Sequence, residues 1–378
     1  MRDKISFHSI CAWTFNPGKG GFVPADMRPA WAGLKAEALP ELIAGRIRPR
    51  LPDNVRLGLE VHYDAEVNED NAATLAASLG EQDLHLAMVT PGAHAHYAYG
   101  GPASLDEEEL ASARDFGRRT LELAYGPLRP AWHPQRELAP TLVLWNGSYG
   151  YDLATPAVAE MYRRLKESIA DLCAREEKAG GELYIAIEPK PNEGHPAMLL
   201  PTVASVLLFW RRLAEGYDIA LERKGVNKEF GHSEMIGLDH VYDTVEEIDC
   251  GGLVHMHLNS QGYNDGIIYG GPGKYDIDHG TRINGMNIAV AGLVAEAGYR
   301  RWKGHDMQPR PYDSEEQALD RVVRSILSWE ACAEAAVELD REALLGMLAA
   351  RQTARAEDLM RGAVVRAQQW FDRAYGGA

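Results

Sequence analysis

Four metal-capable side chains stand at the ends of apolar or β-branched runs in the second half of the chain. They are Glu188, Glu229, His257 and Asp306. A single strand-end carboxylate is often only the partner of a neighbouring arginine or lysine, but three carboxylates and one imidazole at the ends of four successive runs indicate a shared role. Carboxylates and imidazoles are common ligands of divalent metal ions. If these strand ends meet at one rim, the sequence predicts a metal site there.

A second group of possible ligands accompanies the first. Glu229 and His232 form an ExxH pair, and residues three apart share one face of a helical turn. Downstream, YDIDHG contains Asp276 and Asp278, whose side chains point to the same side of an extended chain. Each pattern alone is common in solvated loops. Together they predict a second ion held by Glu229, His232, Asp276 and Asp278, with Glu229 bridging the two ions.

The elements that must position these residues alternate along the chain. Eight short apolar or β-branched runs span residues 5–13, 57–63, 85–90, 141–147, 183–190, 224–230, 253–259 and 299–307. Intervening segments such as 105–124 and 155–181 have apolar residues at the three- and four-residue spacing of helices. We therefore predict an α/β fold, a (β/α)₈ TIM barrel over residues 1–336, with a helical C-terminal extension over 337–378. In such a barrel, chemistry sits at the carboxyl ends of the strands.

Composition restricts the function further. The chain has 378 residues, 46% of them hydrophobic, and a formal net charge of −16, which disfavours nucleic acid and anionic membranes as partners. Four cysteines lie far apart without a CxxC pair, so a disulfide scaffold is not expected. We find no long apolar segment and no GxGxxG or P-loop pattern. We expect a cytoplasmic protein that spans no membrane and needs no cofactor besides metal.

Several stretches resemble the xylose isomerase family of sugar isomerases. They are EPKPNE with LLPT following, NKEFGHSEM, LVHMHLN, YDID and GHDMQPRPYD, in the order of that family. Weaker matches at AWT, VHYD and VLWNG extend the likeness over most of the barrel. The resemblance implies a TIM barrel, two divalent cations, a small-molecule sugar substrate and interconversion of an aldose with its ketose by a hydride shift. It also implies a C-terminal tail that embraces a neighbouring subunit, hence a homodimer or homotetramer.

The same resemblance assigns roles to individual residues. Glu188, Glu229 and Asp306 correspond to ligands of the first metal, and the ExxH histidine and the two YDID aspartates to ligands of the second. Lys190 would contact the carbonyl-side oxygen of the sugar, and His62 would assist ring opening. With Asp278, these two make up the predicted catalytic residues.

The predicted substrate contacts are aromatic. Trp13 and Trp145 would form apolar walls of the sugar site, although large aromatic residues also fill barrel cores. Phe22 lies in a loop that resembles one the family lends to a neighbouring active site.

Three departures from the family pattern bear on the chemistry. His257 replaces an aspartate ligand, as in rhamnose isomerases; Gln308 replaces a lysine, and Ala65 an aspartate three residues after His62, although Asp64 is adjacent. Since imidazole suits later transition metals better than Mg²⁺, we expect Mn²⁺ or Co²⁺ to be favoured. The departures leave two alternatives open: a ketose epimerase or dehydratase on the same barrel, or a sugar-binding barrel without turnover.

Overall fold

The computed structural model describes residues 5–15, 31, 33–92, 96–191, 197–261, 263–264, 267–268, 279–310 and 312–376. Eight parallel strands close into a barrel in the order β1-β14-β9-β8-β6-β4-β3-β2. Their bounds are β1 (Ser6–Cys11), β2 (Val55–Tyr63), β3 (His85–Pro91), β4 (Thr141–Trp145), β6 (Tyr184–Glu188), β8 (Lys224–Glu229), β9 (Leu253–His257) and β14 (Lys303–His305). All eight predicted strands and the (β/α)₈ architecture are confirmed.

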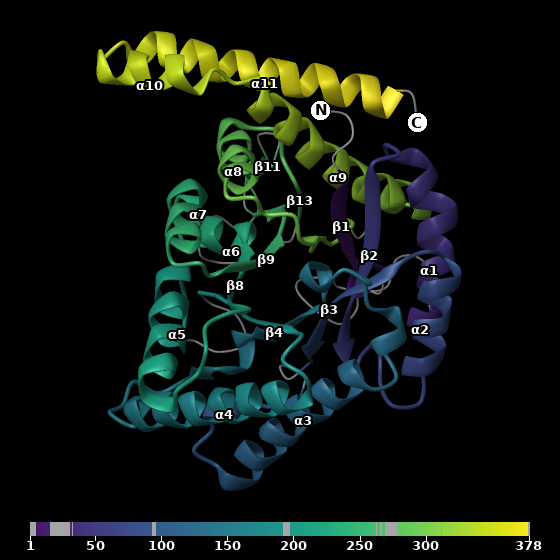
Figure 1. The fold of residues 1–378 in the computed structure, drawn as a ribbon, viewed down its shortest axis with the longest axis vertical. Coiled ribbons are helices and arrows are strands. Elements are labelled where there is room, and N and C mark those ends of the chain that lie inside the picture. The colour runs from purple at the N-terminus through teal and green to yellow at the C-terminus, as the bar shows by residue number, and fades with distance from the viewer. Residues whose placement is uncertain are drawn as a thin grey trace.

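Helices connect the strands on the outside of the barrel (Figure 1). They are α1 (Leu39–Leu42), α2 (Ala72–Glu81), α3 (Glu107–Tyr125), α4 (Val158–Ala179), α5 (Val203–Tyr217), α6 (Phe230–Met235), α7 (His240–Asp249), α8 (Gly285–Glu296) and α9 (Glu315–Val337). Thr202 and Ser314 begin α5 and α9 with reciprocal capping boxes, which satisfy amide groups that a helix start leaves unpaired. Such local signals explain why these helices begin where the sequence pattern changes.

Three two-stranded pairs lie outside the barrel sheet. They are β5 (Gly150–Tyr151) with β7 (Ala197–Met198), β10 (Asn259–Ser260) with β13 (His279–Gly280), and β11 (Tyr263–Asn264) with β12 (Ile267–Ile268). The β10 strand begins two residues after β9 ends, so it extends the polypeptide directly beyond the rim where the chemistry was predicted.

The strand register aligns the predicted ligands. Glu229 at the end of β8 is paired with His257 at the end of β9, and Trp145 on β4 is paired with Glu188 on β6. Asp306 follows β14 directly. The carboxyl ends of β6, β8, β9 and β14 therefore lie together on one rim of the barrel.

The C-terminal region is helical. After α9, the chain continues as α10 (Arg341–Ala349) and α11 (Thr353–Gly376), which run along one edge of the molecule beyond the barrel (Figure 1, yellow). The buried residues Ala363, Ala367 and Phe371 join α11 to the main hydrophobic core. Among the described residues, no helix has both the length and the apolar character that crossing a bilayer requires.

Candidate metal centre

The four strand-end residues converge around one imidazole. Nδ1 of His257 lies 3.3 Å from Oε2 of Glu188, 3.1 Å from Oε2 of Glu229 and 3.4 Å from Oδ2 of Asp306. All four residues are buried, with exposures of 8% or less. The first predicted ligand set is thus gathered within a few ångströms.

The electrostatics of this group are those of crowded acids. Burial, and then the charge of Glu229, raises the pKa of Asp306 to about 7 and raises the pKa of Glu188. Burial alone would raise the pKa of Glu229 as well, but His232 and His257 hold it below its usual range. Three buried acids at this spacing cannot all be ionised unless positive charge is close to them.

The partners that the structure gives these carboxylates include imidazole, amide and indole groups. Nδ2 of Asn227 donates to Oε2 of Glu188 over 2.6 Å, and Nδ2 of Asn259 donates to Oε1 of Glu229 over 2.8 Å. The same Asn259 accepts from the amide of Gly231 over 2.7 Å and so ties β10 to the start of α6. A divalent cation would supply the compensating charge, so the donor set fits a metal ion.

Glu229 divides its two oxygens between two imidazoles. Its Oε2 faces His257, whereas its Oε1 lies 3.0 Å from Nε2 of His232 on α6. Nδ1 of His232 lies 2.9 Å from the carbonyl oxygen of Pro189, which fixes the ring from its other side. The described structure therefore brings the ExxH pair to the same centre. Asp276 and Asp278, the other predicted ligands of a second ion, lie outside the described residues.

Trp13 and His62 form one side of the centre. The Trp13 indole N–H donates to Oδ1 of Asp306 over 2.7 Å, and its ring centroid lies 4.1 Å from that of His62. Trp13 is therefore more than the apolar wall that the sequence suggested, because it also holds a proposed metal ligand.

Lys190 and Trp145 lie beside the same rim. Lys190 is only 3% exposed, and its Nζ sits 4.9 Å from the Trp145 ring centroid, so it is not a surface lysine. The Asn146 amide donates to the carbonyl oxygens of Leu199 and Leu200 over 2.7 and 2.9 Å and thereby anchors the segment after β6. Phe22, the third predicted substrate contact, lies outside the described residues.

Comparisons with known proteins agree with the barrel fold. The sequence is 34% identical over 168 residues to xylose isomerase from Streptomyces lividans, a match that covers 44% of this chain and 39% of that protein. In structure it is similar to L-ribulose 3-epimerase, with a TM-score of 0.58 and 13% identity over 88% of this chain and 96% of that chain. It is also similar to a xylose isomerase domain protein from Alicyclobacillus acidocaldarius, with a TM-score of 0.53 and 14% identity over 88% and 99% of the two chains.

The chain folds as a TIM barrel and is similar over part of its length to a xylose isomerase. No protein family model matches it. The chain spans well under half the length of the curated xylose isomerase that it matches.

Sequence reasoning missed two carboxylates of this barrel. The first is Glu66, whose Oε2 accepts from the His62 amide over 2.7 Å and lies 2.9 Å from Nδ1 of His62. Asp64, the nearer acid in sequence, instead faces His96 over 3.6 Å. Asp64 has a φ of 62°, so the chain turns sharply after β2 and brings the residue four positions beyond His62 back to it. An HxxxE spacing was the available signal.

The second missed carboxylate is Glu60, which lies inside the barrel on β2. Its Oε2 is 2.8 Å from Nε2 of His257, and its Oε1 is 3.1 Å from Nε2 of His255. In the sequence Glu60 stands in the middle of the run LGLEVHY, where a charged residue breaks an otherwise buried pattern. That interruption was the only signal for it.

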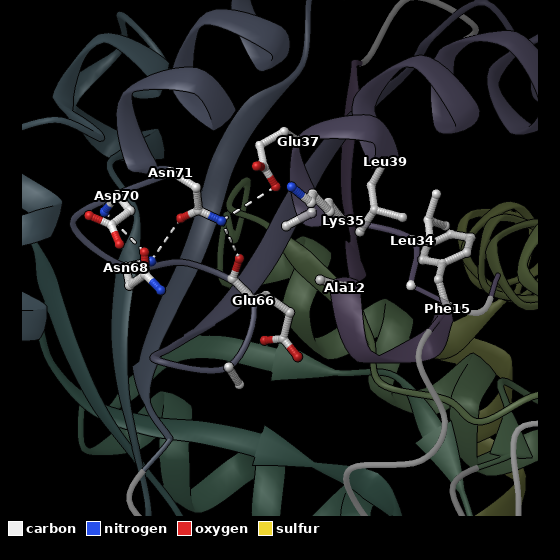
Figure 2. Close-up of a pocket in the computed structure, with 13 residues that line it drawn as sticks. Ala12, Phe15, Leu34, Lys35, Glu37, Leu39, Glu66, Asn68, Asp70 and Asn71 are labelled. Carbon is white, nitrogen blue, oxygen red and sulfur yellow. Dashed lines mark hydrogen bonds between the residues drawn. The ribbon is translucent and has the colours of Figure 1, made fainter.

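A cavity of about 400 Å³ is lined in part by Glu66 (Figure 2). Phe15, Leu34 and Leu39 form an apolar side, while Asn71 on the opposite side donates to the carbonyl oxygen of Glu66 over 2.9 Å. None of the metal-ligand candidates is among the described residues that line it. Glu66 lines this cavity and also contacts His62, so it links the cavity to the Trp13–His62 side of the candidate metal centre.

Proposed function

We propose that this chain is a metal-dependent sugar isomerase that interconverts an aldose and its ketose by a 1,2-hydride shift. The observation that carries the proposal is the division of the Glu229 oxygens, one toward His257 and one toward His232. A carboxylate placed in this way suits two adjacent cations. The partial match to a xylose isomerase supports the same reading.

The residues that would hold the ions fall into two sets. Glu188, Glu229, His257 and Asp306 would bind the first. Glu229 and His232 would bind the second with Asp276 and Asp278, which remain sequence predictions. When bound, the ions would act as Lewis acids on adjacent sugar oxygens and supply several kcal/mol toward the charge that builds on them.

The chain's own residues would handle ring opening. Glu66 fixes Nδ1 of His62, so proton exchange with the ring oxygen of a cyclic sugar would fall to Nε2. Burial lowers the pKa of His62, but the Glu66 carboxylate raises it, and the net shift is upward. The imidazolium form that can donate a proton is therefore favoured.

Lys190 would act on the open-chain sugar. In the conversion of aldose to ketose, a hydride leaves C2 for C1, and the proton of the C2 hydroxyl is transferred to the oxygen on C1. Negative charge develops on the C1 oxygen as the hydride arrives, and the ammonium group of a buried lysine stabilises such charge. Trp145, which packs against Lys190, would help to exclude water.

A panel of aldoses and ketoses with Mn²⁺ tests the activity, and the hydrogen source tests the mechanism. In D₂O, a hydride shift keeps the substrate hydrogen, so the product should contain little deuterium at the transferred position. Glu188→Gln should lose both metal and turnover while the fold, followed by circular dichroism, is retained. Full activity of this variant would remove the isomerase proposal.

An epimerase is the second candidate, and one observation favours it: a barrel similar in structure over 88% of this chain is an L-ribulose 3-epimerase. An epimerase that removes and returns a proton would incorporate solvent deuterium into its product. The same D₂O experiment therefore separates the two candidates. Sugar binding without conversion in Mn²⁺ would instead establish a non-catalytic barrel.

The proposed metal preference is Mn²⁺ or Co²⁺ over Mg²⁺. It rests on His257, whose nitrogen among three carboxylates replaces a hard oxygen ligand. Turnover in Mg²⁺ equal to that in Mn²⁺ would contradict it.

We also propose that the chain forms a homodimer or homotetramer in the cytoplasm. No residue of α10 is buried, and its Leu345 and Leu348 are 57% and 48% exposed, as expected for a helix that packs on another subunit. Light scattering of the wild type and of Leu345→Asp would test this. A monomeric wild type would refute the oligomer.

A further inference from the structure

Glu60 is a fully buried carboxylate that reaches across the barrel interior. It belongs to β2, whereas its partners His255 and His257 belong to β9, and β1 and β14 lie between those strands in the barrel order. A bond between β2 and β9 must therefore cross the inside of the barrel. Glu60 and His255 are 0% exposed and His257 is 1% exposed.

Within the part of the chain that the structure describes, the hydrogen-bond partners of Glu60 are side chains of β1 and β9. Oε1 accepts from the hydroxyl of Ser9 and from Nε2 of His255, and Oε2 accepts from Nε2 of His257 and, over 3.5 Å, from the thiol of Cys11. Four donors thus converge on one carboxylate. Such a network is retained only where it is well satisfied, since an ionised group inside a protein is costly.

The contact with Glu60 determines which nitrogen of His257 faces the metal centre. Nε2 lies 2.8 Å from Glu60, which leaves Nδ1 directed at Glu188, Glu229 and Asp306. A neutral imidazole donates a hydrogen bond from one nitrogen and offers a lone pair from the other. A carboxylate on Nε2 therefore selects the tautomer in which Nδ1 can bind a cation.

The chain of polar contacts continues from His255 away from the metal centre. Nδ1 of His255 lies 3.3 Å from the hydroxyl of Thr141, and Nη2 of Arg301 donates to the same hydroxyl over 3.3 Å. The interiors of such barrels are usually filled by branched apolar side chains. Here the polar side chains of Thr141 and Arg301 take that place. Thr141 contacts His255, and His255 contacts Glu60.

We propose that Glu60 is a positioning residue that holds His257 as an Nδ1 ligand of the metal centre. This inference rests on the proposed function, because it takes His257 as a metal ligand. In this proposal Glu60 contacts His257 and not the metal or the substrate. It acts through the orientation of the imidazole and by making its ligating nitrogen a stronger donor.

The experiment compares Glu60→Gln with Glu330→Gln. Glu330 on α9 is a matched control, because its Oε1 lies 2.9 Å from Nε2 of the buried His8 on β1, but that contact lies between the sheet and α9 and not inside the barrel. Binding of Mn²⁺ and Mg²⁺ to each metal-free protein is measured by titration calorimetry, and thermal unfolding is measured in EDTA.

We expect Glu60→Gln to bind Mn²⁺ about 10–100-fold more weakly than the wild type, the effect typical of losing the carboxylate behind a metal-binding histidine. The loss should be larger for Mn²⁺ than for Mg²⁺, because Mg²⁺ gains less from a nitrogen ligand. Glu330→Gln should keep the wild-type affinities even if it unfolds at a lower temperature. A merely structural role for Glu60 would weaken both metals alike.

If Glu60→Gln does not fold, Glu60→Asp takes its place. It keeps the charge but shortens the reach to His257, so the same loss of Mn²⁺ over Mg²⁺ preference is expected. Wild-type Mn²⁺ affinity in a folded Glu60 variant, or an equal loss in Glu330→Gln, would overturn this inference and leave the proposed function standing. A wild type that binds no Mn²⁺ would overturn both.

Discussion

Two buried glutamate–histidine clusters lie on opposite sides of the same barrel wall. Inside the barrel, Glu60 contacts His255 and His257. Outside, between the sheet and α9, Glu330 contacts His8, and Nδ1 of His8 lies 2.9 Å from Nε2 of His305. The side-chain types, burial and distances are nearly the same.

The two clusters differ in what lies beyond the second nitrogen of the histidine. Beyond His257 stand three more carboxylates at the carboxyl rim of the strands. Beyond His8 and His305 stands Ser325, whose hydroxyl lies 2.8 Å from Nδ1 of His305 and which is itself bound to Thr281. The outer cluster also contains the buried Lys303, whose positive charge offsets that of Glu330, so we interpret this cluster as structural. A buried histidine–carboxylate pair thus becomes a candidate metal site only where unbalanced charge remains.

The largest effect on activity is expected when the negative charge of Glu229 is removed. Glu229→Gln keeps the shape of the side chain but takes away an acid that faces both His232 and His257. Because a bound metal supplies several kcal/mol and each 1.36 kcal/mol is tenfold, kcat/KM should fall on the order of 10³-fold. Sugar conversion and Mn²⁺ titration measure it. Unchanged turnover would place the chemistry elsewhere.

A third buried acid, Glu247, differs from both clusters because it contacts no histidine among the described residues. Neither oxygen of Glu247 on α7 has a hydrogen-bond partner among the described residues; Lys228, Asp243, Glu246 and Tyr299 are the charged or titratable groups near it. Burial, opposed by the charge of Lys228, raises its pKa to about 8.

A raised carboxyl pKa means that the folded state prefers the protonated acid. Its contribution to stability is complete below the ordinary pKa of about 4.3 and is lost as pH rises toward 8. Glu247→Gln should therefore unfold at the same denaturant concentration as the wild type near pH 4.5 but be more stable, by on the order of 2–4 kcal/mol, near pH 8. Urea unfolding at the two pH values tests this. Parallel pH profiles would show that Glu247 is ionised in the folded protein.

Glu66 tests whether a histidine–carboxylate pair at the rim does chemistry. Glu66→Gln should lower kcat/KM for a cyclic sugar by about 10–100-fold, since positioned acid–base groups contribute factors of this size or more. The loss of kcat/KM should be smaller for a substrate that is mostly in the open-chain form, because it needs no ring opening. Asp64→Asn is the control, because Asp64 is exposed and faces His96. An equal effect of both variants would argue against a specific role for Glu66.

The smallest expected effect on activity comes from the outer cluster. Glu330→Gln removes one partner of His8 and should reduce the free energy of unfolding by about 1–3 kcal/mol, the usual cost of leaving a buried polar group poorly satisfied. Sugar conversion at 25 °C should be unchanged while the melting temperature falls. A loss of turnover without a loss of stability would contradict the structural role assigned to the Glu330–His8 cluster.

The sequence was sufficient for the barrel and for its rim, for definite reasons. Strand runs separated by helical periodicity leave few topologies, and strand ends such as Glu188 and His257 are then placed by the fold itself. Glu60 was missed because a single charge inside an apolar run does not reveal its partner across a barrel. Glu66 was missed because a turn at Asp64, and not the strand pattern, brings it to His62.

The central claim is that the rim of β6, β8, β9 and β14 binds two divalent cations. Titration calorimetry of the EDTA-treated wild type with Mn²⁺, checked by plasma emission analysis of the dialysed protein, tests it most directly. The account predicts two Mn²⁺ ions per chain, with Glu229→Gln losing both. A wild type that retains no Mn²⁺ at saturating concentrations would contradict it.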